Sequence, residues 1–93
     1  MAGDPYNALE KFLKASHELA LQDGSLQERL EFAMNEFVNP VSEEDLPWDV
    51  VDTFQQLRRE AREPRSLSDE AARRYIATIL TITSELELQL SRV

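Results

Sequence analysis

Residues that interrupt helices are sparse in this sequence, and their positions divide it into a few long segments. The 93 residues include only two glycines and four prolines, namely Gly3, Gly24, Pro5, Pro40, Pro47 and Pro64. Glycine and proline are the residues that most often end or interrupt regular structure. Four segments follow from their positions, and each is long enough to form a helix of several turns.

Each of the four segments opens with a helix-start signal. Asp4 before Pro5 places an acceptor at the N-cap and a proline at the first helical position. The other starts are marked by a serine three residues before an acid or just before an acidic pair, as in Ser25 with Glu28, Ser42 with Asp45, and Ser66 or Ser68 before Asp69 and Glu70. These signals predict helices over residues 5–22, 26–38, 46–63 and 69–90.

Apolar residues recur at helical spacing in every segment, so each predicted helix has one apolar stripe. The stripes are Leu9, Phe12, Leu13, Ser16, Leu19 and Ala20; Leu26, Leu30, Ala33, Met34 and Phe37; Leu46, Val50, Phe54, Leu57 and Ala61; and Ala72, Tyr75, Ile76, Ile79, Ile82, Leu86 and Leu90. Residues 75–83 are rich in β-branched side chains and would also suit a strand, but the sequence offers no second strand to pair with it. We therefore expect an all-α single domain over residues 1–93.

Short connections favour antiparallel neighbours, so the simplest arrangement is an antiparallel up-down-up-down four-helix bundle. Such a bundle collects the start of the third helix and the end of the fourth at one end. The end of the third helix and the start of the fourth lie at the other end.

The composition excludes several classes of function. The sequence has no cysteine, which excludes disulfides, thiolate metal sites and thiol nucleophiles and makes a reducing cytoplasm the expected location. The first residues resemble no signal peptide, and the charged residues leave no apolar run long enough for a membrane span. A formal net charge of −8 repels nucleic-acid phosphates at long range, so a nucleic acid is not the expected partner.

A basic cluster nevertheless interrupts this acidic sequence. Between residues 58 and 74 lie six arginines, which are Arg58, Arg59, Arg62, Arg65, Arg73 and Arg74. They support an alternative function, a nucleic-acid-associated helical protein in which this cluster contacts phosphates. Against it, the first turn of the fourth helix carries Asp69 and Glu70, and Glu18, Asp23 and Glu28 are expected close enough to pair with several arginines.

Carboxylates gather at the opposite predicted end, where Asp45, Asp49 and Asp52 are spaced to share a helical face. They match no calcium-loop pattern, and the helix dipole explains acids at a helix start equally well, so we expect no metal and no cofactor. Glu85 and Glu87 differ, because acids in the last turns of a helix oppose its dipole. They therefore indicate an electronegative surface that has a function other than stabilising the helix.

Apolar side chains off the stripes mark this end as an interface. Trp48 flanks the third stripe and Leu88 faces nearly opposite Leu90. We expect them beside Leu86, Leu90, Tyr6, Phe37 and Val38, as an apolar cluster rimmed by carboxylates. The alternative is that Trp48 covers the core and Leu88 is an isolated exposed leucine.

The sequence therefore predicts no catalytic residue. His17, the only histidine, lies at a core margin without a nucleophile to activate, and two distant glycines form no phosphate-binding loop. The predicted function is non-catalytic binding of another protein, or of a second copy in a homodimer, by a regulator, adaptor or inhibitor. The predicted contact residues are Trp48, Leu88, Glu43, Glu44, Asp45, Asp49, Glu85 and Glu87. Mimicry of nucleic-acid charge is a special case that the sequence leaves open.

Overall fold

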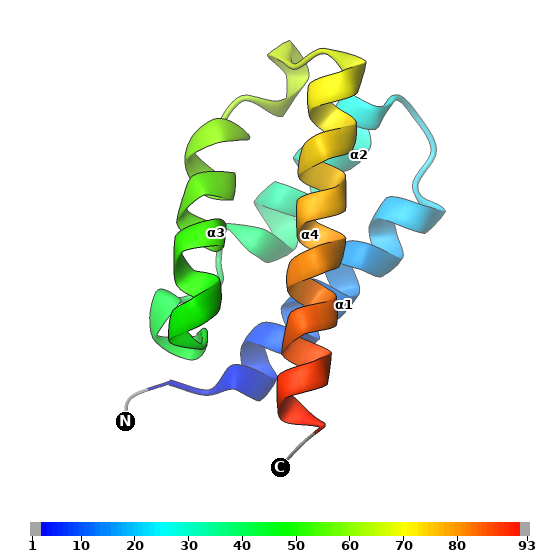
Figure 1. Ribbon diagram of the computed structural model, residues 1–93. Helices are drawn as coiled ribbons and strands as arrows, with labels where there is room; N and C mark the ends of the chain where they lie inside the picture. Colours follow the sequence, from blue (N-terminus) through cyan, green and yellow to red (C-terminus); the bar gives the residue numbers. More distant parts are fainter. Residues whose placement is uncertain (1–2, 92–93) are drawn as a thin grey trace.

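The computed structural model describes residues 3–91, which fold into helices joined by short connections (Figure 1). The α-helices are α1 (Pro5–Leu21), α2 (Leu26–Ala33), α3 (Trp48–Glu60) and α4 (Asp69–Leu90). A π-helical turn, η1 (Met34–Val38), continues α2, and two 3-10 turns, η2 (Glu43–Asp45) and η3 (Pro64–Ser66), precede α3 and α4. No strand occurs within residues 3–91, so the all-helical prediction is confirmed, and residues 75–83 lie inside α4.

The helix-start signals act largely as predicted. The Asp4 carboxylate accepts a hydrogen bond from the Tyr6 backbone N–H at 3.1 Å. Ser25 and Glu28 form a reciprocal capping box, in which each side chain accepts from the other's backbone N–H. Ser68 caps α4. The signal at Ser42 was misread, because it starts the short η2 turn and not α3.

The helix bounds differ most for α3, which we expected over residues 46–63. Leu46 is extended because a residue that precedes proline disfavours helical angles, so Trp48 becomes the first helical residue. At the other end Ala61 closes the helix before Pro64. α1 ends one residue early, at Leu21, whereas α4 has the predicted bounds.

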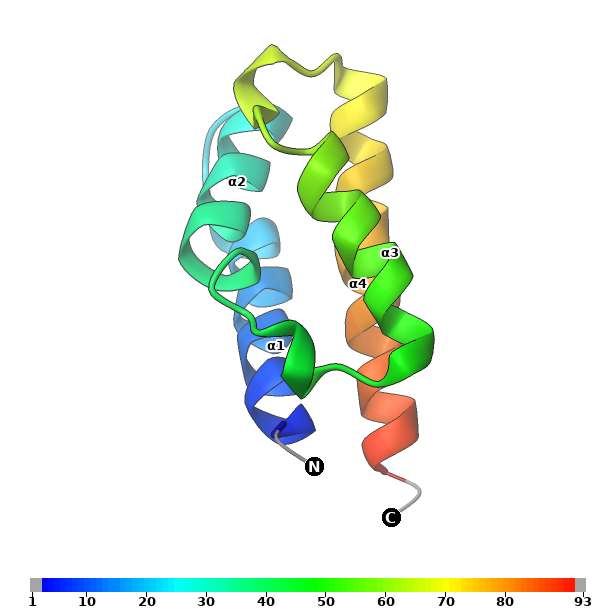
Figure 2. The ribbon, with the colours of Figure 1, turned by 90° about the vertical axis from the view of Figure 1, so that its left-hand side faces the viewer.

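α4 is the central element of the packing, because it contacts α1, α2 and α3. Figure 1 shows α3 beside α4, running in the opposite direction, and α1 crossing behind α4; Figure 2 shows the α1 and α2 pair on one side and the α3 and α4 pair on the other. The radius of gyration, 12.6 Å, is close to the roughly 12 Å expected for a compact domain of this length. One cluster of buried apolar side chains lies between the helices.

The buried face of α1 differs from the predicted stripe. Ala8 and Ala15 are fully buried, whereas Leu13 is 43% exposed and Ala20 is also exposed, which corrects the prediction for both. The small alanine side chains let the α4 backbone come close, since the distance between helix axes depends on the side chains at the contact. The closeness is evident at Thr83 of α4, whose hydroxyl lies 3.3 Å from the carbonyl oxygen of Phe12.

The predicted α3 and α4 stripes are buried, completely in α3 and for the most part in α4. Phe54 of α3 meets Phe12 of α1 edge to face, with ring centroids 6.1 Å apart. In α4 the side chains of Ile76 and Leu90 are only partly buried.

The π-turn changes which residue of the second helix enters the core. In a regular α-helix Phe37 would follow the buried Ala33 four positions on. The wider turn gives that place to Val38, five positions on, and the Asn39 N–H correspondingly bonds the Met34 carbonyl at 2.8 Å. Val38 is therefore fully buried and Phe37 lies at the edge of the core, which corrects the predicted burial of Phe37.

Among the described residues, none of the helices combines the length and apolarity that crossing a membrane requires.

Candidate protein interface

The predicted acidic surface draws on three elements at one end of the molecule. Figure 2 shows η2, the first turn of α3 and the last turns of α4 at the end that also holds the start of α1. These elements carry all eight residues that we predicted for partner binding. The six arginines lie toward the opposite end, where η3 joins α3 to α4 (Figure 1).

Trp48 is the most exposed large apolar side chain of the described residues. Its exposed fraction is 88%, compared with 4% for Val50 two positions on. Because Trp48 stands about 160° around the helix from Val50, its indole points away from the core. The alternative in which Trp48 covers the core is wrong.

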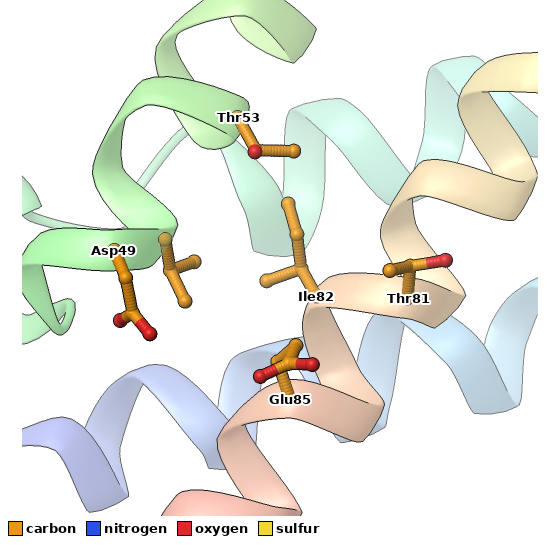
Figure 3. Close-up of a pocket in the computed structure, with 6 residues that line it drawn as sticks. Asp49, Thr53, Thr81, Ile82 and Glu85 are labelled. Carbon is orange, nitrogen blue, oxygen red and sulfur yellow. The ribbon is translucent and has the colours of Figure 1, made fainter.

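Asp49 and Glu85 line one pocket between α3 and α4, with a volume of about 280 Å³ (Figure 3). Val50 and Ile82 form its apolar wall, and Thr53 and Thr81 add hydroxyl groups. Gln89 of α4 donates to both carboxylate oxygens of Asp49, at 3.1 and 3.2 Å. The pocket thus presents two carboxylates from facing helices, a suitable acceptor pair for a lysine or arginine side chain.

Asp45 does not share a helical face with Asp49 and Asp52, because it lies in η2, ahead of Pro47. Its carboxylate accepts hydrogen bonds from the Asp4 backbone N–H at 2.8 Å and from the Asn7 side-chain amide at 3.1 Å. These bonds, the one from Asp4 first, lower the pKa of Asp45 below its ordinary value. Asp45 therefore fastens the start of α1 to η2.

The remaining predicted contact residues are exposed. Gln55 of α3 donates to the Glu43 carboxylate at 3.1 Å, while Glu44 and Glu87 are exposed, and Leu88 is 49% exposed. The single apolar cluster that we expected here does not form, because Val38 and Leu86 are fully buried and Phe37 lies against α1.

Most arginines of the basic cluster lie beside acidic or aromatic side chains of the chain itself. Arg65 Nε pairs with Glu31 Oε1 at 2.9 Å, Arg58 stacks on the Phe54 ring with its guanidinium carbon 5.3 Å from the centroid, and Arg74 lies 5.9 Å from the Tyr75 ring. Arg73 is exposed, and Arg59 and Arg62 line a hollow together with Glu60 and Glu63. The acidic partner of Arg65 is thus Glu31, which the sequence did not predict. Hydrogen bonding with Ser25, and then the nearby charge of Arg65, lowers the pKa of Glu28.

A carboxylate and a phenol meet beside this cluster. The Tyr75 hydroxyl donates to Glu60 Oε1 at 2.9 Å. Hydrogen bonds from Gln56 and then Tyr75 lower the pKa of Glu60, while partial burial and the Glu60 carboxylate raise the pKa of Tyr75. The interaction holds the end of α3 against α4.

The structure contains a second exposed apolar area that the sequence did not predict. Phe32 of α2 and Phe37 of η1 meet edge to face with centroids 6.1 Å apart, and Phe37 lines a hollow with Leu13 of α1. Phe32 lies off the apolar stripe predicted for residues 26–38, which was one sign of this area. No residue pattern predicted the π-turn that places Phe37 beside Phe32.

In the part of the chain that the structure describes, no three His, Asp or Glu side chains come together in a way that could hold a metal ion. His17 is exposed on α1, where it lines the same hollow as Leu13 and Phe37.

Comparison with protein-family models, with curated proteins and with solved structures finds no match to this chain.

Proposed function

We propose that this chain is a non-catalytic cytoplasmic regulator, adaptor or inhibitor that binds a basic surface of another protein with the acidic end around Trp48. The proposed fold is an up-down-up-down antiparallel four-helix bundle, supported by the opposite directions of α3 and α4 (Figure 1). The observation that carries the function is the 88% exposure of Trp48.

An indole left in water is a strong anchor for a partner. Tryptophan is enriched among the residues that dominate binding energy at interfaces, and truncating such an anchor costs about 2 kcal/mol or more. Trp48 lies on the first turn of a helix whose other side is anchored by Val50 and Phe54, so the backbone that carries the indole is fixed before binding.

The carboxylates around Trp48 supply charge complementarity. Asp49 and Glu85 from facing helices line one pocket, and Glu43, Glu44 and Glu87 are exposed at the same end. Such a field accelerates encounter with a basic partner and loses strength as salt screens it.

The test compares capture of proteins from the native cell by three immobilised chains: the wild type, Trp48→Ala and Leu21→Ala. Leu21 is the matched control, because it is 64% exposed and lies on α1, at the end of that helix away from η2. The expected result is a basic protein that the wild type and Leu21→Ala retain and that Trp48→Ala loses, with affinity falling as salt rises. Equal retention by all three would contradict the proposal, as would loss of helicity in Trp48→Ala.

Association of the chain with itself is a distinct form of the same function. Light scattering of the pure protein measures it directly. A dimer that Trp48→Ala converts to monomer would identify the partner as a second copy.

The grouping of six arginines at one end favours nucleic-acid binding as the second candidate. It predicts that the chain binds labelled nucleic acid and that changing Arg58, Arg59 and Arg62 to glutamate abolishes binding. If the function is protein binding through Trp48, these three changes should not affect capture of the partner protein.

A further inference from the structure

The face formed by α1, α2 and η1 carries an open apolar strip, the α1–α2 face. Its apolar members are Leu13, 43% exposed, Phe32, 37% exposed, and the partly buried Phe37. Figure 2 shows these elements on the side of the molecule opposite the α3 and α4 pair. Trp48 on α3 therefore belongs to a different surface.

Two hollows lie along this strip. One, of about 500 Å³, is lined by Leu13, Lys14, His17, Glu18 and Phe37. The other, of about 430 Å³, is lined by Gln22, Asp23, Glu28, Glu31, Phe32, Asn35, Glu36 and Arg65. The edge-to-face contact of Phe32 with Phe37 and the hydrogen bond from Gln22 to Glu18, 2.7 Å long, connect the two. We call the two neighbouring hollows the groove; its apolar floor is Leu13, Phe32 and Phe37, and the other residues that line the hollow at Phe32 are all polar.

The rim of the groove is acidic. Its residues include five carboxylates, those of Glu18, Asp23, Glu28, Glu31 and Glu36, against two cations, Lys14 and Arg65. Both cations are already paired within the chain, Lys14 with Glu10 at 3.1 Å and Arg65 with Glu31 at 2.9 Å. The unbalanced charge that the groove presents to a partner is therefore negative.

We propose that the α1–α2 face binds a basic amphipathic helix of a partner protein. Leucine-like side chains on one side of that helix pack against Leu13, Phe32 and Phe37, and lysine or arginine side chains on its flanks pair with the rim carboxylates. This mode of recognition matches an apolar helix face to an apolar groove. On α1 and its C-cap the residues that line the two hollows run from Leu13 to Gln22, about 14 Å, so the contact covers roughly three turns of a partner helix.

This inference extends beyond the function proposed for Trp48 and uses none of its residues. The contribution of the π-turn is specific, because it withdraws Phe37 from the core and places it beside Phe32. π-turns occur frequently at functional sites.

The experiment uses three synthetic peptide probes of about 16 residues, longer than the contact itself, because shorter isolated helices are marginally stable in water. The first places leucines on one helical face with lysines and alanines elsewhere. The second has the same composition with the leucines spread around the helix. The third replaces the lysines of the first with glutamate. Binding to the full chain is measured by fluorescence anisotropy, and the contact surface is mapped by amide chemical shifts.

Three variants of the chain locate the binding. Leu13→Ser removes apolar floor, and Glu36→Lys reverses a rim charge on an exposed residue and keeps the test informative if Leu13→Ser fails to fold. Leu80→Ser is the matched control, because Leu80 on α4 has nearly the same exposure, 46%, and lines none of the pockets described here.

We expect the first peptide to bind most tightly and to shift amides of α1, α2 and η1. Leu13→Ser should weaken it about tenfold, Glu36→Lys about threefold at low salt and less at high salt, and Leu80→Ser should leave it unchanged. Trp48→Ala should also leave it unchanged, which separates this inference from the proposed function.

Equal binding of the first two peptides would overturn the proposal, because only charge would then be recognised. Binding of the glutamate peptide, or amide shifts centred on Trp48, would overturn it as well. Self-association that Leu13→Ser abolishes, measured by sedimentation, would assign the face to a second copy of the chain and equally overturn it.

Discussion

Thr83 places a hydroxyl group inside the contact between α1 and α4. It is 4% exposed, and its hydroxyl lies 2.9 Å from the Ser16 hydroxyl and 2.8 Å from the Ile79 carbonyl oxygen. A buried polar group is tolerated only when it is hydrogen-bonded, and here the bonds also join two helices.

Replacing Thr83 with valine should lower the free energy of unfolding by about 1 to 2 kcal/mol, because the shape is kept while Ser16 loses its partner. Urea denaturation measures the change. The matched control is Thr81→Val on the same helix, where the side chain is exposed and little change is expected. Equal stability of the two variants would show that the buried hydroxyl contributes nothing.

Asp45 links stability to pH. Its hydrogen bonds from Asp4 and Asn7 lower its pKa in the folded state, so it stabilises the fold above the unfolded-state pKa of about 4 and ceases to do so as the pH falls through the folded-state value. Asp45→Asn should therefore lower the urea midpoint at pH 7, and the deficit relative to wild type should close as the pH falls below about 4.

The control for this experiment is Asp52→Asn, which removes the same charge from an exposed position on α3. A deficit for Asp45→Asn that stayed constant from pH 7 to acid would contradict the assigned cause, since it would not follow the protonation of Asp45.

At η1 the second helix has one residue inserted in its turn, because the backbone hydrogen bond joins residues five apart and not four apart. Removing the exposed Glu36 brings Val38 to four positions after Ala33, so the helix should continue as a regular α-helix with Val38 still in the core. We expect this deletion to change stability by no more than about 1 kcal/mol, the typical size of a single-site effect.

Deletion of Gln56 from α3 is the matched comparison. It also removes an exposed residue, but it rotates the buried Leu57 and Ala61 away from the core, and we expect a loss of more than about 3 kcal/mol. Circular dichroism during thermal unfolding compares the two. If they were equally damaging, the π-turn would not be an inserted residue that the core tolerates.

The elements that the sequence predicted well are those in which local signals and packing agree. The bounds of α4 and the capping box of Ser25 with Glu28 follow from side-chain hydrogen bonds a few residues apart. The misread features depend on contacts that a local pattern does not contain. Ala8 and Ala15 are buried in place of Leu13 because α4 approaches so closely, and the π-turn arises where Val38 reaches the core in place of Phe37.

At the scale of the molecule, the end around Trp48 and the α1–α2 face are both rich in carboxylates, whereas the opposite end carries the six arginines. The sequence alone separated the acidic end from the arginine-rich end, because this depends only on where the charged residues lie along the helices. It did not separate Trp48 from Phe37, which it placed in one cluster and which belong to two surfaces. Their positions depend on the way the helices pack in three dimensions, which is why residue spacing alone placed them together.

The central position of α4 gives a prediction for the whole molecule. Residues 1–67 contain α1, α2 and α3 but lack the helix that contacts all three, and we expect this fragment to unfold without a cooperative transition. Mixing it with a peptide of residues 68–91 should restore helicity and a thermal transition in circular dichroism. A cooperative transition in the fragment alone would show that α4 is dispensable for the core.

The order of the helices along the chain also determines when the protein acquires its shape during synthesis. α1 and α4, which pack directly together, are separated by 47 residues of sequence that include α2 and α3. A ribosome therefore releases three amphipathic segments before their common neighbour exists, and at about 5 to 20 residues per second this interval lasts a few seconds. We expect nascent chains in that interval to expose the apolar faces that α4 later covers, and to be the form of this protein most open to chaperones.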